Sequence, residues 1–332
     1  MERNALLGLG GAALVLLALP RLLDAYYLGV LASALALAIA CLGVNLLLGS
    51  TGLLSLGHAA YFGMGAYVGG FLFTFGDVRS FELYVVAGVL GAAVLAALVG
   101  SACVRSTRIF FTILTLAYAQ VVHSVFVSGA VFRLFGERGK GVYYLYEGGL
   151  YLPHFAIAGR TFSPATARLV LYHAVVVAFL AAALVCWRVA HSPFGLALRA
   201  IRDNETRAAH VGIRVRRTRW RAFIVSGAVA GLGGALAGQL HRQVTTQQLD
   251  WILSAELVIA CVLGGSRVFA GPIVGALVVV ALEEVASRFA LHHDLLLGLM
   301  LVAVVSLLPG GVLAGAERAA AWLAGRNFSR AR

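Results

Sequence analysis

Apolar runs dominate this chain and are separated by short polar segments. Several runs are about 20 residues long and carry no charge, for example residues 83–104 and 169–187, and an α-helix needs this length to cross a bilayer. The runs lack the strict alternation of membrane β-strands. Backbone amides in hydrocarbon must be paired within a helix or a closed barrel, so the pattern predicts an all-α, polytopic transmembrane helical bundle.

The runs predict about ten spans in one transmembrane domain over residues 1–315, followed by a short basic tail at residues 316–332. Two runs, 250–264 and 295–309, are short for a complete crossing, so a tilted, interrupted or re-entrant helix is an open alternative there. The predicted spans are residues 5–19, 27–48, 53–75, 83–104, 109–128, 169–189, 222–240, 250–264, 271–287 and 295–309.

The distribution of arginine predicts how the chain lies in the membrane. Residues 188–221 hold nine arginines and only two acidic residues, and loops rich in Lys and Arg stay in the cytoplasm. Counting spans from this loop places the N- and C-termini in the cytoplasm and the segment at residues 129–168 outside. A cleaved signal peptide within residues 1–20 is a less favoured alternative, because no convincing small-x-small cleavage site follows that run.

Composition excludes several classes of function. The chain is 61% hydrophobic and 12% charged, with a formal net charge of +12, which does not suit a soluble protein. Because the basic residues lie mostly between apolar runs, membrane orientation explains them and we expect no nucleic-acid partner. The sequence has no GxxxxGK[ST], HExxH or GxSxG motif. We therefore expect neither an ATPase site nor another catalytic site in this chain.

Histidine and cysteine give no sign of a metal site. The nine histidines form no recognisable ligand set, and the four cysteines include no CxxC pair. The cysteines lie inside or at the edges of apolar runs, where free, buried thiols are typical. These four residues are Cys41, Cys103, Cys186 and Cys261.

The first candidate site is the segment at residues 49–67, where Gly, Ser and Thr interrupt an apolar run. Ser55 and His58 lie within it, and Asn45 precedes it. Such a segment predicts a discontinuous helix, since glycines and hydroxyl groups can satisfy backbone groups that a break releases. Two interpretations stay open: these polar residues line a translocation path, or they serve helix packing, as the spacing of Gly65 and Gly69 also suggests.

The second candidate is the polar segment at residues 191–213, which predicts a short amphipathic helix. Ser192 suits the N-cap and Pro193 the first helical position. This helix, with Phe194, Leu198 and Ile201 near one face, could dock into a groove on a partner protein or lie on anionic lipid. Both alternatives stay open.

Two further segments are rich in small residues, and one of them also carries charge. Glu256 is an ionisable group near the outer end of a span, and it either contributes to a translocation path or reaches the membrane interface. Glu283 and Glu284 are typical of an outer span end. The small residues at 226–238 favour close helix packing over pore lining.

Four segments in order resemble one family, the LivM-type permeases of branched-chain amino acid ABC importers. They are LGVNLLLGSTGLLSLGHAAYFGMGAY (42–67), RSTRIFFTILTLAYAQ (105–120), SPFGLALRAIRDNETRAAHVGI (192–213) and VLGGSRVFAGPIVGAL (262–277). The likeness covers about residues 30–315. It implies an ABC importer permease fold, a multi-pass location in the bacterial inner membrane, and one half of a translocation path for leucine, isoleucine and valine.

The resemblance also implies partners. These are a homologous second permease, two cytoplasmic ATPases that hold ATP and Mg, and a periplasmic or extracellular substrate-binding protein. Membrane lipid also surrounds the chain. The resemblance implies that this chain itself binds no cofactor. Within a coupling loop at about 188–221, the residues implied to face the ATPase are Ser192, Pro193, Phe194, Gly195, Arg199, Arg202, Asp203, Asn204 and Gly212. The candidate translocation path comprises Asn45, Ser55, His58 and Glu256.

The substrate and the mode of action have alternatives. Importers of urea and short amides share the same signatures, and the outer segment reads GERGKGVYYL at 136–145, where family members often carry an acidic stretch rich in Gly and Asp. A stand-alone secondary transporter or channel would need ion-coupling acids within its spans. Only Glu256 is a candidate for that role.

Overall fold

The computed structural model describes most of the central chain. Described are residues 10–11, 13–76, 78–106, 109–128, 150–151, 156–157, 160–161, 164–266 and 268–287, with a few positions between 295 and 313. Four segments lie wholly or largely outside the described residues. They are the start of the first predicted span, most of the outer segment, the greater part of the run at 295–309 and the basic tail.

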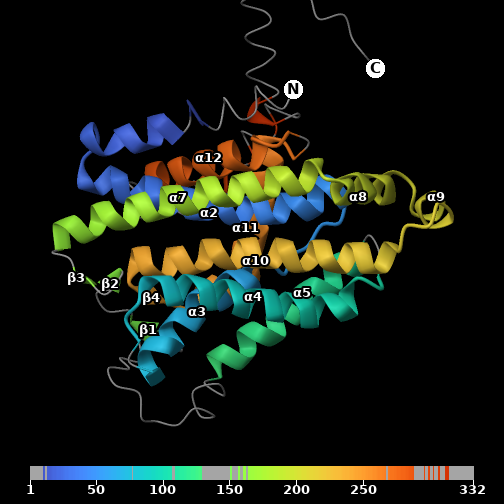
Figure 1. Cartoon of the computed structure of the whole chain (residues 1–332), viewed down its shortest axis with the longest axis horizontal. Coiled ribbons are helices and arrows are strands. Elements are labelled where there is room, and N and C mark those ends of the chain that lie inside the picture. Colours follow the sequence, from blue (N-terminus) through green and yellow to red (C-terminus); the bar gives the residue numbers. More distant parts are fainter. Residues whose placement is uncertain are drawn as a thin grey trace, which may run out of the picture.

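The described chain is a bundle of long helices that lie side by side, which confirms the polytopic helical class (Figure 1). The long helices are α2 (Ala25–Thr51), α3 (His58–Gly76), α4 (Phe81–Cys103), α5 (Ile109–Val127), α7 (Pro164–His191), α10 (Val215–His241) and α12 (Gly271–Ser287). The shorter elements are η1 (Leu19–Arg21), α8 (Pro193–Asp203), α9 (Glu205–His210), η2 (Thr246–Leu249) and α11 (Trp251–Gly264).

Five described helices are long and apolar enough to cross a membrane, namely α2, α4, α5, α7 and α10. The count of ten spans therefore stays a prediction. Helix α11 has 14 residues, about 21 Å at 1.5 Å per residue, which is short of a bilayer core of about 30 Å. Helix α10 begins at Val215, earlier than predicted, because its first turns hold arginines that lie outside the apolar run.

Glycines let α10 pass through the centre of the bundle between α2, α3 and α4 (Figure 1). A Cβ on Gly233 would lie 2.6 Å from the Ala36 carbonyl oxygen of α2, and one on Gly234 would overlap the Phe62 carbonyl of α3. Backbones approach this closely only where no side chain intervenes. The packing interpretation of residues 226–238 is thus confirmed.

The bundle has two distinct ends (Figure 1). One, here named the arginine end, carries α8 and α9 together with the C-terminus of α7 and the N-terminus of α10. The opposite end holds short ladders that the helical patterns did not predict: β1 (Leu150–Tyr151) pairs antiparallel with β4 (Gln243–Val244), and β2 (Ala156–Ile157) with β3 (Arg160–Thr161). All four cysteines are free and buried, as predicted.

Candidate translocation cavity and coupling element

A break separates α2 from α3. Helix α2 ends at Thr51, Gly52 has a left-handed φ of 69°, and α3 begins only at His58. The discontinuous helix predicted for residues 49–67 is confirmed, whereas the helical run drawn from residue 53 began too early. Glycine suits position 52 because a Cβ is unfavourable at positive φ.

Hydroxyl groups satisfy the irregular backbone of residues 52–57, which lies largely buried in the protein. Thr51 Oγ1 accepts from Leu53 N (3.3 Å), Ser55 Oγ accepts from Gly57 N (3.3 Å), and Thr112 Oγ1 of α5 donates to Leu54 O (2.8 Å). Non-helical backbone at membrane depth is tolerated only with such partners.

His58 and Ser55 lie inside the subunit, with exposed fractions of 0% and 1%. His58 Nε2 lies 2.7 Å from Ser226 Oγ of α10, and Ser226 Oγ donates to the Gly43 carbonyl of α2 (2.6 Å). Because that hydroxyl gives its single proton to Gly43, Nε2–H of His58 donates to Ser226. His58 and Ser226 thereby join the three helices. The contribution of His58 and Ser55 to a translocation path stays a prediction.

Asn45 lies on α2, two turns before the break, and is partly exposed. Its Oδ1 is buried and has no hydrogen-bond partner among the described residues. A Cβ on Gly49 would stand 3.0 Å from this oxygen. The contribution of Asn45 to a translocation path stays a prediction.

Glu256 lines a polar cavity of about 600 Å³ at the opposite end, bounded by α2, α10, η2, α11 and α12. A neighbouring cavity of about 830 Å³ shares Ser33, His241 and Glu283 and adds Arg168 and Glu284. The polar residues of the first cavity are Ser33, His241, Gln243, Thr245, Gln247, Gln248, Asp250, Glu256 and Glu283.

The lining of this cavity suits a small zwitterion. A side-chain hydrogen bond joins the Glu256 carboxyl group of α11 to the Glu283 carboxyl group of α12. Such a bond needs a proton on one of the two groups, so the pair carries one negative charge, which attracts an ammonium group. His241 and the glutamine amides offer donors to a carboxylate. Ionisable groups within a membrane bundle mark solute or ion pathways by default. Sequence reasoning missed His241 and treated Glu283 only as a span end, because the pairing of helices was unknown.

The start of α8 matches its prediction. Ser192 is the N-cap, its Oγ accepts from Gly195 N (3.3 Å), and Pro193 follows at the first turn. The apolar face, however, is already used: Leu198 and Ile201 are buried against the chain's own helices α2, α7 and α10. Leu198 and Ile201 therefore do not face a partner or lipid, while docking of the whole segment stays a prediction.

Several residues implied to face an ATPase point into the subunit. Gly195 is buried, and a Cβ there would lie 2.5 Å from the Val189 carbonyl oxygen at the end of α7. Arg199 Nη1 donates to Ala190 O (2.8 Å), and Phe194 packs partly against the core. The exposed members of the set are Pro193, Arg202, Asp203, Asn204 and Gly212.

A charge pair that sequence reasoning missed ties α9 to α10. Arg219 is only 5% exposed, and its Nη1 and Nη2 donate to the two carboxylate oxygens of Glu205 at 2.8 and 2.9 Å. Glu205 is half exposed. Asn204 caps α9 through its side chain, which accepts from Arg207 N (2.9 Å). Glu205 and Arg219 are 14 residues apart in the sequence, and this spacing gives no indication that their side chains pair.

We predict an asymmetry between the two halves of this pair. Glu205→Ala leaves the guanidinium of Arg219 buried without its partner, and we expect a loss of about 2–3 kcal/mol. Arg219→Met leaves a carboxylate that water can reach and fills the space of the arginine stem, so about 1 kcal/mol or less is expected. Thermal unfolding of both variants in detergent tests this. Equal losses would contradict the assigned burial.

Comparison with known proteins decides the family. A model described as "Branched-chain amino acid transport system / permease component" matches residues 26–305. The chain belongs to this family. It is a multi-pass membrane protein of the permease type, and its homologues are transport subunits.

Curated relatives carry the same description. The "High-affinity branched-chain amino acid transport system permease protein LivM" of Escherichia coli (strain K12) is 26% identical over 285 residues, 82% of this chain and 66% of LivM. The corresponding LivH of the same organism is 24% identical over 291 residues, 84% of this chain and 92% of LivH. The chain thus spans just under two thirds of LivM. No solved structure matches it.

One relative has a different named role. The "Autoinducer 2 import system permease protein LsrC" of Klebsiella pneumoniae is 30% identical over 131 residues, 36% of this chain and 38% of LsrC. Family membership alone therefore leaves the transported solute of this permease open.

Proposed function

We propose that this permease forms one half of the translocation path of an ATP-driven importer for branched-chain amino acids. The observation that carries the proposal is the polar cavity lined by Glu256, Glu283 and His241 in a permease whose relatives include LivM and LivH. A branched-chain amino acid brings an ammonium and a carboxylate that such a lining can bind. Apolar wall residues such as Leu37 and Val280 suit its side chain.

The energy source lies in partner subunits in this proposal. The chain has no phosphate-binding loop, so two cytoplasmic ATPases bind ATP and Mg and contact the exposed residues of α8 and α9. A second permease completes the path, and a periplasmic or extracellular binding protein delivers the solute. The assembly lies in the bacterial inner membrane.

Uptake of labelled leucine tests the function. Cells that lack the chain should regain high-affinity uptake when it is restored, and excess isoleucine or valine should compete with leucine. Competition by urea or acetamide alone would contradict the substrate and favour the amide importer. A tagged chain should co-purify with an ATPase pair. A chain that transports alone, without these subunits, would favour a secondary transporter.

We predict that the arginine end is cytoplasmic, together with both termini. In a chain without its four native cysteines, Thr206→Cys on α9 should resist an impermeant thiol reagent added to intact cells, because the positive-inside rule keeps this loop inside. Gln247→Cys at the opposite end should react. Both side chains are exposed, so burial does not explain a difference. The reverse labelling pattern would overturn the orientation.

A further inference from the structure

Arg202 contacts the end of α2, inside its own chain. Its Nη1 donates to the Gly49 carbonyl (2.6 Å), and its Nε lies 3.6 Å from Asp203 Oδ1. The last carbonyls of a helix lack partners within it, and a cation there also meets the negative end of the helix dipole. Arg202 thus caps α2 from a different element.

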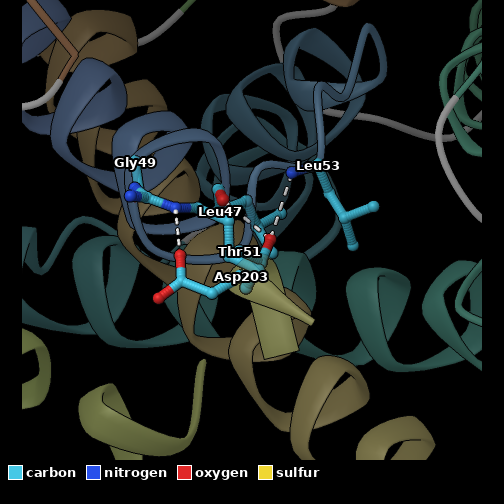
Figure 2. A network of polar contacts seen from close by, with 6 residues as sticks. Leu47, Gly49, Thr51, Leu53 and Asp203 are labelled. Carbon is cyan, nitrogen blue, oxygen red and sulfur yellow. Dashed lines mark hydrogen bonds and ion pairs between the residues drawn. The ribbon is translucent and has the colours of Figure 1, made fainter. Parts of the chain in front are cut away.

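The neighbouring carbonyls of α2 have local partners instead. Thr51 Oγ1 donates to Leu47 O (2.7 Å), and Gly52 N donates to Leu48 O (3.1 Å). Figure 2 shows this cluster at the point where α2 ends. Gly49 O is therefore the carbonyl of this turn that depends on α8.

The stem of Arg202 also fits the turn that follows. A Cβ on Gly52 would stand 3.0 Å from Arg202 Cγ, and Gly52 has the left-handed φ that starts the break. A shift of α8 therefore acts directly on the first residue of the segment at 52–57. The far end of that segment is held by α11, where Ser254 Oγ accepts from Ala59 N (2.8 Å).

Space beside Arg202 allows its contact to open. A cavity of about 550 Å³ lies between the end of α2 and α8–α9, lined by Thr51, Gly52, Arg202 and Arg219 among others. The Arg202 side chain is 40% exposed, whereas that of Arg219 is 6% exposed. Arg202 can change rotamer without repacking the core, while Arg219 is fixed by burial. The two arginines are suited to different roles.

We propose that Arg202 is a positioning residue that links α8–α9 to the α2–α3 break, and through the break to α11, which carries Glu256. Movement of α8–α9 by a partner releases or restores the bond to Gly49, and residues 52–57 follow. This rests on the proposed function and assigns Arg202 to contacts within the subunit instead of to the ATPase surface. A coupling route of this kind requires a direct functional test.

The test uses the complete reconstituted importer and compares Arg202→Met with Arg105→Met. Methionine at position 202 keeps Cβ and Cγ against Gly52 but lacks the N–H that donates to the Gly49 carbonyl. Arg105 is the control because it is exposed, follows α4 and lies outside the coupling loop. For Arg202→Met we expect leucine transported per ATP hydrolysed to fall about tenfold, the effect of one hydrogen bond from a charged group. ATPase co-purification stays at the wild-type level, and Arg105→Met keeps the wild-type ratio.

A second measurement does not depend on the substrate. The rate of maleimide labelling is measured for Ser55→Cys, a buried position of the break, in a chain without native cysteines. We expect this rate to rise several-fold when Arg202→Met is added. Adding Arg105→Met instead should leave the rate unchanged. If Arg202→Met does not accumulate, Arg202→Gln replaces it, because its shorter side chain does not reach the Gly49 carbonyl.

Three results would each overturn the proposed link between Arg202 and the α2–α3 break. The first is a wild-type ratio of leucine transported to ATP hydrolysed in the Arg202 variant, and the second is unchanged labelling at position 55. The third is loss of the ATPase subunits on co-purification, which would place Arg202 at the partner surface. A wild-type complex that moves no branched-chain amino acid would contradict the proposed function. The labelling experiment still decides the link in that case.

Discussion

Gly234→Val should prevent stable insertion of the permease, with little or no full-length protein recovered from membranes. The Cβ of any residue at position 234 would overlap the backbone carbonyl of Phe62 on α3. Overpacking costs about 1–3 kcal/mol where neighbouring side chains can shift, and a backbone carbonyl has less freedom to shift. We therefore expect a cost above about 3 kcal/mol even for Gly234→Ala.

Gly29→Val is the matched control, because Gly29 lies on α2 with no atom within 4 Å of its Cβ position. Both changes add the same β-branched side chain to a helix, so the intrinsic cost of valine is shared. Membrane content by immunoblot and thermal unfolding in detergent measure the difference. Equal accumulation of the two variants would contradict the close contact of α10 with α3.

The predictable part of the fold follows from local patterns. Apolar runs located α2, α4 and α7 to within a few residues, except that α7 begins at Pro164, since a helix in hydrocarbon must be apolar over its length. Caps are local as well, so Ser192 and Pro193 marked the start of α8 correctly. The small-residue stretch at 226–238 correctly signalled close packing.

The arrangement of the site could not be predicted in the same way. The apolar face of α8 read equally well as a docking face, and only the tertiary structure shows that Leu198 and Ile201 are already buried. The polar cavity draws residues from α2, α10, η2, α11 and α12. No spacing in the sequence brings His241 and Glu283 together, because that depends on which helices are neighbours.

Glu256→Gln and Glu283→Gln should each reduce leucine uptake about tenfold or more, which corresponds to loss of one charged contact. The reason is that the two hydrogen-bonded carboxyl groups on this cavity wall share a proton and present one negative charge to the ammonium group of the solute. An amide at either position breaks the carboxyl pair that holds this charge. The combined variant should lose less than the sum of the two single losses, because the groups act on one ligand atom.

Misfolding is a poor explanation for such a loss, because removing a charge from a membrane bundle lowers its insertion cost. Glu82→Gln is the control: Glu82 is exposed in the first turn of α4 and does not line this cavity. Uptake of labelled leucine is measured at equal membrane content and equal ATPase co-purification. Wild-type uptake by the combined Glu256→Gln and Glu283→Gln variant would remove this cavity from the translocation path, since two neutral amides cannot replace the attraction of carboxylates for an ammonium ion.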